Sequence, residues 1–354
     1  MTADEIARRI VAEAVAPACA AGCTVRSGSW HRELGGDGDV LFDLASVTKP
    51  FTAVAVACAG IAPDTPLGAL LSEARGTESE RVTIEHLLAH RAGLEAHRPL
   101  YAPLLRGESV DIAAALHEAA DARRSDAQGA VPPDGFAPLY SDVGYLLAGE
   151  ALARRIGVRD AGEAIGRLVL EPLGIATAAG TVRDLSARGI RGPFAPTEEV
   201  AWRGGLIAGA VHDENAWALT GLGGSGHSGL FATADAVLMF GQAVLDALDG
   251  LESALGNVDL HWLVRERPGG SLRAGFDGKS ASGSSAGARM ATASFGHLGF
   301  VGTSLWIDPE NHTIVTLLTN RVRYGRNHLA IRSARPWAHD ALWERGREIY
   351  DDQP

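Results

Sequence analysis

Lysine is nearly absent from this chain of 354 residues. Only two of its 32 lysine and arginine residues are lysines, Lys49 and Lys279. Arginine keeps its proton at ordinary pH, whereas lysine can lose its proton when its surroundings lower its pKa. In a sequence that uses arginine wherever a positive charge is enough, a retained lysine is a candidate for proton transfer. Lys49 is the better candidate, because it follows a serine by three residues.

The chain also lacks the features of several protein classes. No apolar run reaches the roughly 18 residues that a membrane span needs. The net charge is −11 and there is no basic stripe, which argues against nucleic acid or an anionic membrane as a partner. The three cysteines, Cys19, Cys23 and Cys58, indicate neither a disulfide framework nor a zinc site. With 46% hydrophobic residues, the composition predicts a soluble globular protein.

The N-terminal segment superficially imitates an export signal. Arg8 and Arg9 precede a short apolar run, but Glu13 interrupts that run. The apolar residues here instead follow one face of a helix, so residues 3–18 are predicted to be the first helix of the fold. We therefore expect a cytoplasmic protein. The sequence leaves its oligomeric state open.

The order of elements predicts an α+β fold. Strand-like segments lie near the start of the chain and again at 300–307 and 313–319, and the middle is mostly helical. This order favours an antiparallel sheet assembled from both chain ends and flanked by helices, with an all-helical lobe inserted. We expect residues 1–62 plus 230–354 to form the sheet domain and residues 63–229 the helical lobe, with the active site between them.

Ser46 and Lys49 are the first candidates for catalysis. They lie at the start of the apolar run Pro50–Ala59, which is typical of a buried helix. On a helix, residues three apart share a face, so the lysine can serve the serine as a base or proton relay. The positive end of the helix dipole would favour a developing alkoxide at Ser46. Alone, however, S-x-x-K also fits a helix cap followed by a solvated lysine.

Two further segments could contribute to the same site. Tyr140 precedes Ser141 and Asp142 at the start of a predicted helix, and a tyrosine near a cation can shuttle protons. His297 and Gly299 precede the predicted strand 300–307, where a glycine allows close approach of substrate and the next N–H can face an oxyanion. For the first segment, the structural alternative is that Ser141 or Asp142 caps the helix while Tyr140 packs; the second segment alone is a weak signal.

Together these segments resemble the serine beta-lactamase and penicillin-binding protein superfamily, in its branch of class C beta-lactamases, D,D-peptidases and family VIII esterases. Leu41–Pro50 resembles the nucleophile segment of that branch, Tyr140–Asp142 takes the place of its Y-x-N motif, and His297–Gly299 that of K-T-G. Further similarity covers 211–216, 226–231 and 302–309.

The resemblance implies a beta-lactamase/transpeptidase-like fold and a role for each matching residue. Ser46 would be the acylated nucleophile, and Lys49 and Tyr140 would share the acid and base work. The backbone N–H groups of Ser46 and Phe300 would form the oxyanion hole. Asp142, His297 and Gly299 would contact the substrate. No metal and no organic cofactor is implied.

Two departures from the family pattern shift the expected substrate. Asp142 replaces the usual asparagine, and a carboxylate near Lys49 would favour the ammonium form, which makes Tyr140 the better proton acceptor. His297 replaces the usual lysine and is mostly neutral at pH 7, so a fixed cation for a substrate carboxylate is missing. We therefore expect small esters or amides. Arg321 or Arg323 is a candidate substitute cation.

Several alternatives remain open from the sequence. The protein could be a true beta-lactamase, a D,D-carboxypeptidase, or a catalytically weak binding or sensor protein of the same fold. Ser285 fits a G-x-S-x-G pattern but lacks the flanking strand and helix that this motif needs. Two histidine groups could in principle bind a metal but favour structural roles; they are His212 with Asp213, Glu214 and His227, and His86 with His90.

Overall fold

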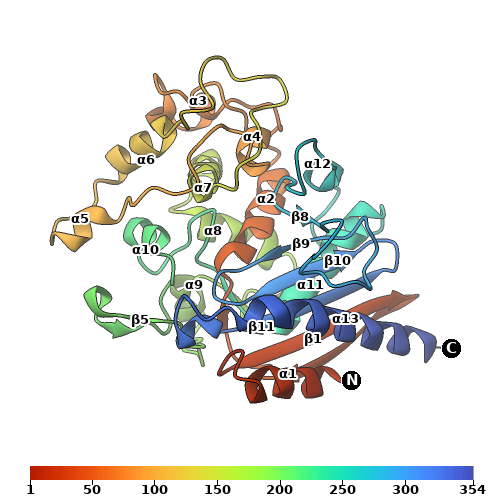
Figure 1. Ribbon diagram of the computed structural model, residues 1–354. Helices are drawn as coiled ribbons and strands as arrows, with labels where there is room; N and C mark the ends of the chain where they lie inside the picture. The colour runs from red at the N-terminus through yellow and green to blue at the C-terminus, as the bar shows by residue number, and fades with distance from the viewer. Residues whose placement is uncertain (354) are drawn as a thin grey trace.

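A computed structural model describes residues 1–353 of the chain. Its centre is an antiparallel sheet of six strands in the order β2–β1–β11–β10–β9–β8 (Figure 1). These strands are β1 (Cys19–Ser27), β2 (Ser29–Gly36), β8 (Asp277–Gly278), β9 (Phe295–Leu298), β10 (Ser304–Asp308) and β11 (Thr313–Thr319). The first and last parts of the chain meet where β1 pairs with β11, from Cys19 opposite Thr319 to Val25 opposite Thr313.

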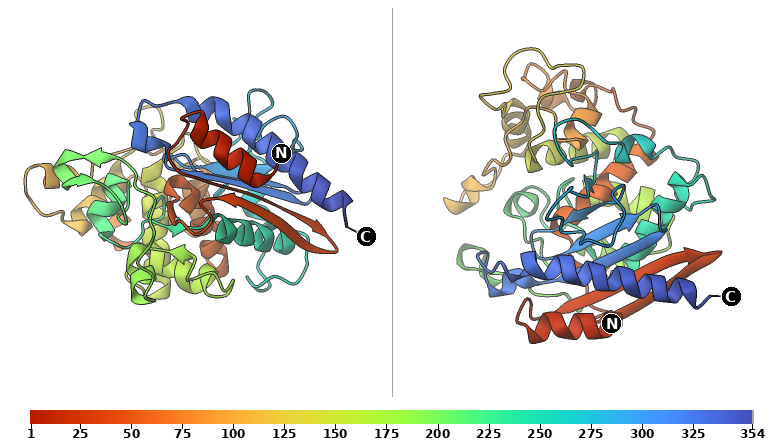
Figure 2. Two further views of the ribbon diagram at one scale, coloured as in Figure 1. Left: turned by 90° about the horizontal axis from the view of Figure 1, so that it is seen from below. Right: turned by 45° about the vertical axis from the view of Figure 1, so that its right-hand side comes forward.

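Helices cover both faces of this sheet. The terminal helices α1 (Ala3–Ala12) and α13 (Ala330–Asp351) lie side by side on one face, and α11 (Ala234–Leu248) lies on the other (Figure 2). β11 reads as a fully buried strand because both of its faces are covered. The expected antiparallel sheet flanked by helices is therefore confirmed.

Between the two parts of the sheet the chain is mostly helical. The helices here are α2 (Thr48–Cys58), α3 (Leu67–Leu70), α4 (Ile84–Leu88), α5 (Ala102–Leu105), α6 (Ile112–Asp121), α7 (Asp142–Ile156), α8 (Ala161–Ile165), α9 (Val182–Ala187) and α10 (Glu214–Thr220), and α12 (His261–Val264) follows later. Shorter elements are η1 (Ala45–Val47), η2 (Ser72–Ala74), η3 (Gly166–Leu170), η4 (Ala201–Arg203), η5 (Arg321–Tyr324), β3 (Phe42–Asp43), β4 (Ala179–Gly180), β5 (Glu199–Val200), β6 (Gly205–Leu206) and β7 (Phe231–Ala232). The division at residues 62 and 230 stays a prediction.

Two predicted element boundaries were wrong. The first helix ends at Ala12 rather than residue 18, because the chain turns there to enter β1. The single strand expected at 300–307 is a turn followed by β10, and His297 already belongs to the preceding strand β9. Phe300 therefore lies in a β9–β10 turn. Among residues 1–353, no helix combines the length and apolar character that crossing a membrane requires.

Candidate active site

Ser46 lies in a strained turn at the entrance to α2. It occupies the middle of η1, immediately ahead of the helix. The preceding Ala45 has φ of 47°, in the left-handed region that non-glycine residues rarely adopt. The Ala45 N–H donates to Asp43 Oδ1 at 2.7 Å, and this buried carboxylate helps to hold the turn. The nucleophile candidate is thus fixed by its own loop.

Lys49 points from the first turn of α2 toward Ser46. Its side chain is fully buried, and Nζ lies 2.9 Å from Ser46 Oγ and 2.7 Å from Asp142 Oδ1. The three-residue spacing therefore brings the two groups together as expected. Asp142 is the first residue of α7, whose N-terminus Ser141 caps by accepting the Gly144 N–H.

The ion pair with Asp142 sets the charge state of Lys49. Burial alone would lower the pKa of this lysine, but the Asp142 carboxylate and the Tyr140 phenol outweigh burial and raise it above its ordinary value. Lys49 is therefore an ammonium at neutral pH. In this state it can donate hydrogen bonds to Ser46 but cannot accept the proton of the serine.

Tyr140 completes the cluster. Lys49 Nζ lies 4.7 Å from the centre of the Tyr140 ring. Burial raises the pKa of Tyr140, the charge of Lys49 opposes this effect, and the net pKa remains raised. The Tyr140 ring and Ser46 Oγ therefore both lie beside Lys49 Nζ.

His90 packs against the ring of Tyr140, a contact that the sequence did not reveal. The imidazole stacks on the Tyr140 ring with centroids 4.6 Å apart, and its Nδ1 accepts the Ser141 N–H at 2.9 Å. His90 lies beyond the end of α4 with φ of 60°, so it does not share a helix with His86. Instead, His86 caps the start of α4 by accepting the Thr83 N–H.

We expect His90→Ala to lower kcat by about 10²-fold for a substrate that reacts at Ser46, because Tyr140 loses the ring and the backbone contact that hold its position. The measurement is kcat and KM for the parent and the variant. The loss should fall on kcat, since His90 does not touch the cavity beside Ser46. Unchanged kcat in a folded variant would contradict this positioning role.

His297 also joins the cluster, as a neutral group. Its ring centroid lies 5.9 Å from that of Tyr140, and Nδ1 bonds the Leu298 carbonyl at 2.8 Å. Burial, and then the nearby Lys49 ammonium, lower the pKa of His297 to about 3. The position therefore provides no positive charge at pH 7.

Gly299 brings the β9–β10 turn against the Ser46 loop. A Cβ on Gly299 would lie 1.9 Å from Thr303 Oγ1 and 2.5 Å from the Leu44 carbonyl oxygen, so no side chain fits. Thr303 Oγ1 donates to that same carbonyl at 2.9 Å. From the sequence we expected Gly299 to allow close approach of the substrate. In the structure, Gly299 instead allows close approach of the β9–β10 turn to the loop that carries Ser46.

Ser46 and Phe300 both line a cavity of about 200 Å³. Within residues 1–353, the backbone N–H groups of Ser46 and Phe300 donate no hydrogen bond. Free N–H groups beside a nucleophile are what an oxyanion hole requires. The cavity is further lined by Ala45, His97, Tyr101, Asp142, His212, Asp213, Glu214, His227, Ser228 and Arg326.

The substitute cation expected at Arg321 or Arg323 does not line this cavity. The Arg321 guanidinium donates to the carbonyls of Phe300, Arg326 and His328, so it holds the Phe300 turn. Arg326 reaches the cavity instead, but it is paired with Glu198 and with Glu214. Sequence reasoning missed Arg326 because no motif marks the segment after η5.

The competing motifs take structural roles. Ser285 lies in a loop without the strand and helix of a nucleophile elbow, and its carbonyl bonds His339 Nδ1 at 2.6 Å. His227 bonds Asp213 at 2.8 Å through Nε2, whereas His212 bonds Thr197 at 3.2 Å through Nδ1. In the described part of the chain, no group of three or more His, Cys, Asp or Glu residues is arranged to hold a metal ion.

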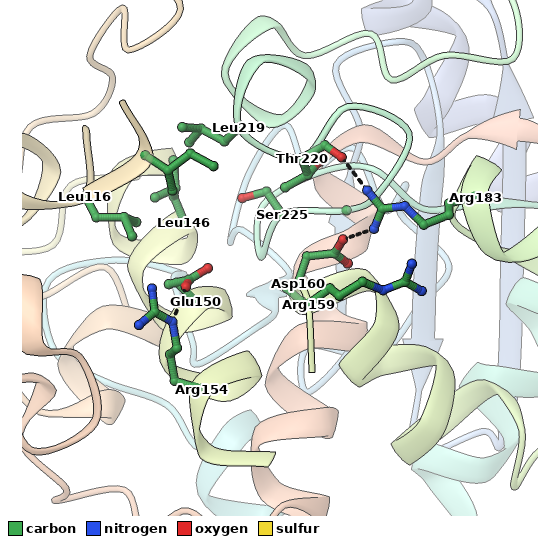
Figure 3. A pocket seen from close by; sticks show the side chains of 13 residues that line it. Leu116, Leu146, Glu150, Arg154, Arg159, Asp160, Arg183, Leu219, Thr220 and Ser225 are labelled. Carbon is green, nitrogen blue, oxygen red and sulfur yellow. Dashed lines mark hydrogen bonds and ion pairs between the residues drawn. The ribbon is translucent and has the colours of Figure 1, made fainter. Parts of the chain in front are cut away.

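A second cavity, of about 300 Å³, is lined mainly by α6, α7 and the segment around Thr220 (Figure 3). Four of its charged groups pair with one another, Arg154 with Glu150 and Arg183 with Asp160, and the fifth, Arg159, pairs with Glu163 outside the lining. The cavity contains none of the Ser46 cluster. The chemistry therefore assigns the candidate active site to the smaller cavity.

The sequence of this chain is similar to that of known proteins. The family model described as Beta-lactamase matches residues 4–335. A protein of Salmonella agona (strain SL483), provisionally named a D-alanyl-D-alanine carboxypeptidase, is 27% identical over 208 residues. Those residues are 53% of this chain and 46% of that protein, so the chain spans about half the length of the curated relatives it matches.

Solved structures share the fold. A beta-lactamase from Mycobacterium bovis, Mb2281c, has a TM-score of 0.61 and 22% identity, covering 96% of this chain and 99% of its own. EstCE1, a hydrolase with promiscuous acyltransferase activity, has a TM-score of 0.65 and 18% identity, covering 93% of this chain and 96% of its own. A class C beta-lactamase from Rhodobacter sphaeroides has a TM-score of 0.63 and 16% identity, covering 95% of this chain and 97% of its own. Since the family model covers nearly the whole chain, the chain belongs to the Beta-lactamase family.

Proposed function

We propose that this protein is a serine hydrolase that forms an acyl-enzyme on Ser46 and acts on small esters or amides. The observation that carries the proposal is the contact of Ser46 Oγ with the buried Lys49, at 2.9 Å, beside an open cavity. A buried ammonium that is held by a carboxylate and aimed at a serine has a ready use in nucleophilic catalysis. Membership of the Beta-lactamase family supports the same class of reaction.

The charge states suggest how the proton moves. In the active form the Lys49–Tyr140 pair has lost one proton, and Asp142 keeps the ammonium on Lys49. Tyr140 is then the phenolate that accepts the Ser46 proton as Oγ bonds to the substrate carbonyl carbon. The oxyanion receives hydrogen bonds from the N–H groups of Ser46 and Phe300.

Collapse of this intermediate releases the alcohol or amine, which takes the proton from Tyr140. Water then attacks the acyl carbon, gives a proton to Tyr140, and displaces Ser46 Oγ, which takes the proton back. The products are a carboxylic acid and the free enzyme. No redox or metal step enters this sequence, so the residues of the cluster suffice for it.

The neutral state of His297 favours esters and amides over substrates with a carboxylate beside the reacting bond. With its pKa lowered to about 3, His297 offers no charge to such a group. Arg326 is already paired with Glu198 and Glu214. Carboxypeptidase activity, suggested by the name of the Salmonella relative, would require a carboxylate-binding cation that the cavity does not offer in free form.

Parallel turnover of p-nitrophenyl butyrate and nitrocefin tests the proposal. We expect ester hydrolysis with kcat/KM at least about 10²-fold above that for nitrocefin, because nitrocefin carries a carboxylate without a partner here. Comparable nitrocefin turnover would favour the beta-lactamase alternative. Absence of turnover and of any covalent adduct with both substrates would favour the binding-protein alternative.

Asp142→Asn should move the rising alkaline limb of the pH–rate profile toward lower pH. The Asp142 carboxylate raises the pKa of Lys49 and that of Tyr140, so its removal lowers both and the active form appears at lower pH. The measurement is kcat/KM for p-nitrophenyl butyrate across the alkaline range. A profile that overlays the profile of the parent would contradict the proposed influence of Asp142.

A further inference from the structure

The cavity beside Ser46 contains two buried polar atoms that no protein group satisfies. His212 is 4% exposed and its Nε2 has no hydrogen-bond partner, and Ser228 is 2% exposed and its Oγ has none. Both residues line the cavity. An unpaired buried polar atom is costly to the fold, so two such atoms on residues that line one cavity favour a ligand that completes them.

We assign to His212 the neutral tautomer in which Nε2 is the acceptor. In this tautomer Thr197 Oγ1 donates its only proton to the Ile207 carbonyl and accepts from the His212 Nδ1–H at 3.2 Å, and Glu198 Oε2 lies 3.9 Å from Nε2. Burial, followed by the charge of Arg326, lowers the pKa of His212, which keeps the ring neutral. Nε2 thus carries a lone pair without a hydrogen-bond partner, on a residue that lines the cavity.

Asp213 adds a fixed negative charge next to this acceptor. Its Oδ1 accepts from the Ala216 N–H at 2.8 Å and bonds His227 Nε2 at 2.8 Å, while Oδ2 has no hydrogen-bond partner within residues 1–353. Burial would raise the pKa of Asp213, but the pairing with His227 and the Ala216 N–H outweigh it and lower the pKa well below its usual range. The carboxylate thus stays ionised.

Two of the three carboxylates that line the cavity have a cationic partner. Asp142 is paired with Lys49, and Glu214 is paired with Arg326, the single arginine or lysine among the residues that line the cavity. Arg326 is already shared between Glu214 and Glu198. Among the residues that the structure describes, no positively charged donor is paired with the oxygen Asp213 Oδ2 of the third carboxylate.

We propose that this cavity binds a primary ammonium group of the substrate, with Asp213 Oδ2, His212 Nε2 and Ser228 Oγ accepting its three N–H bonds. An ammonium has three donors and no acceptor, which matches one anionic and two neutral acceptors. The inference rests on the proposed function and narrows its substrates to esters or amides of amino acids and similar amine-bearing acids.

The test compares two amides of the same shape. Alaninamide, in both enantiomers, carries an ammonium where 2-methylpropanamide carries a methyl group. Binding is measured by calorimetry on the Ser46→Ala protein, so the readout does not depend on turnover. We expect alaninamide to bind about 10- to 100-fold more tightly, as for hydrogen bonds to a charged group.

Further variants of the Ser46→Ala protein show which residues cause the preference for alaninamide over 2-methylpropanamide. Asp213→Asn keeps a side chain able to cap α10 and should remove most of the preference. Ser228→Ala removes only a hydroxyl without a protein partner and should reduce the preference several-fold. Asp111→Asn, the same change at the cap of α6, is the matched control and should leave the preference intact.

Equal binding of the two amides, binding of neither, or a preference that survives both Asp213→Asn and Ser228→Ala would overturn the inference. If Asp213→Asn fails to fold, Ser228→Ala decides alone. Failure of the proposed function has a different signature, namely ester hydrolysis that persists in the Ser46→Ala protein.

Discussion

Replacing Ser46 with alanine should abolish hydrolysis of p-nitrophenyl butyrate, lowering kcat by about 10⁴-fold or more. The variant loses the only serine hydroxyl that contacts Lys49 among the residues that the structure describes. Its fold should survive, because alanine is smaller and the turn is held by backbone contacts, including the Ala45 N–H to Asp43. The measurement is kcat of the purified Ser46→Ala protein with p-nitrophenyl butyrate, compared with kcat of the parent.

Ser285→Ala is the matched control for this substitution. Ser285 is the nucleophile of the rival G-x-S-x-G pattern, but it lies in an irregular loop. We expect parent-like turnover from this variant. Loss of activity on Ser285→Ala with activity retained on Ser46→Ala would reverse the assignment of the nucleophile.

Replacing Lys49 with methionine should lower kcat by about 10³-fold, within the range typical of an acid or base group. Methionine fills a similar buried volume but cannot donate to Ser46 or stabilise a phenolate at Tyr140. The Asp142 side chain, which is 27% exposed, loses its partner yet can be hydrated. The effect should therefore be larger on catalysis than on stability.

The second lysine provides the control for this experiment. Lys279 donates only to backbone carbonyls of Ala288 and Met290, in a loop far from α2 in the sequence. Lys279→Met should retain parent-like kcat. Thermal melting of both variants separates catalysis from folding, and a Lys49→Met protein that is folded and fully active would remove lysine from the mechanism.

The catalytic cluster was largely predictable because short spacings and local chemistry determine it. Ser46 and Lys49 meet since they are three residues apart at the start of one helix, and the effect of the Asp142 carboxylate on Lys49 follows from simple electrostatics. The order of strands and helices similarly predicted the antiparallel sheet built from both chain ends.

The walls of the cavity were not predictable in the same way. The His212 N–H donates to Asp43 across 169 positions of sequence, and only the folded chain brings this histidine beside Ser46. The contact of His90 with Tyr140 was not predictable, because the left-handed backbone of His90, just past the end of α4, cannot be read from histidine spacing. The turn at Phe300 was missed because the apolar pair Phe300 and Val301 fits a strand, although a glycine lies on each side of the pair.

The most direct test of the account is the intact mass of the parent protein, stopped rapidly during turnover of p-nitrophenyl butyrate and then mapped by peptide. The account predicts a transient adduct in which one butyryl group replaces one proton, located on the peptide that contains Ser46. The adduct should be absent from Ser46→Ala. Turnover that proceeds with the adduct on another residue would contradict the claim that Ser46 is the nucleophile.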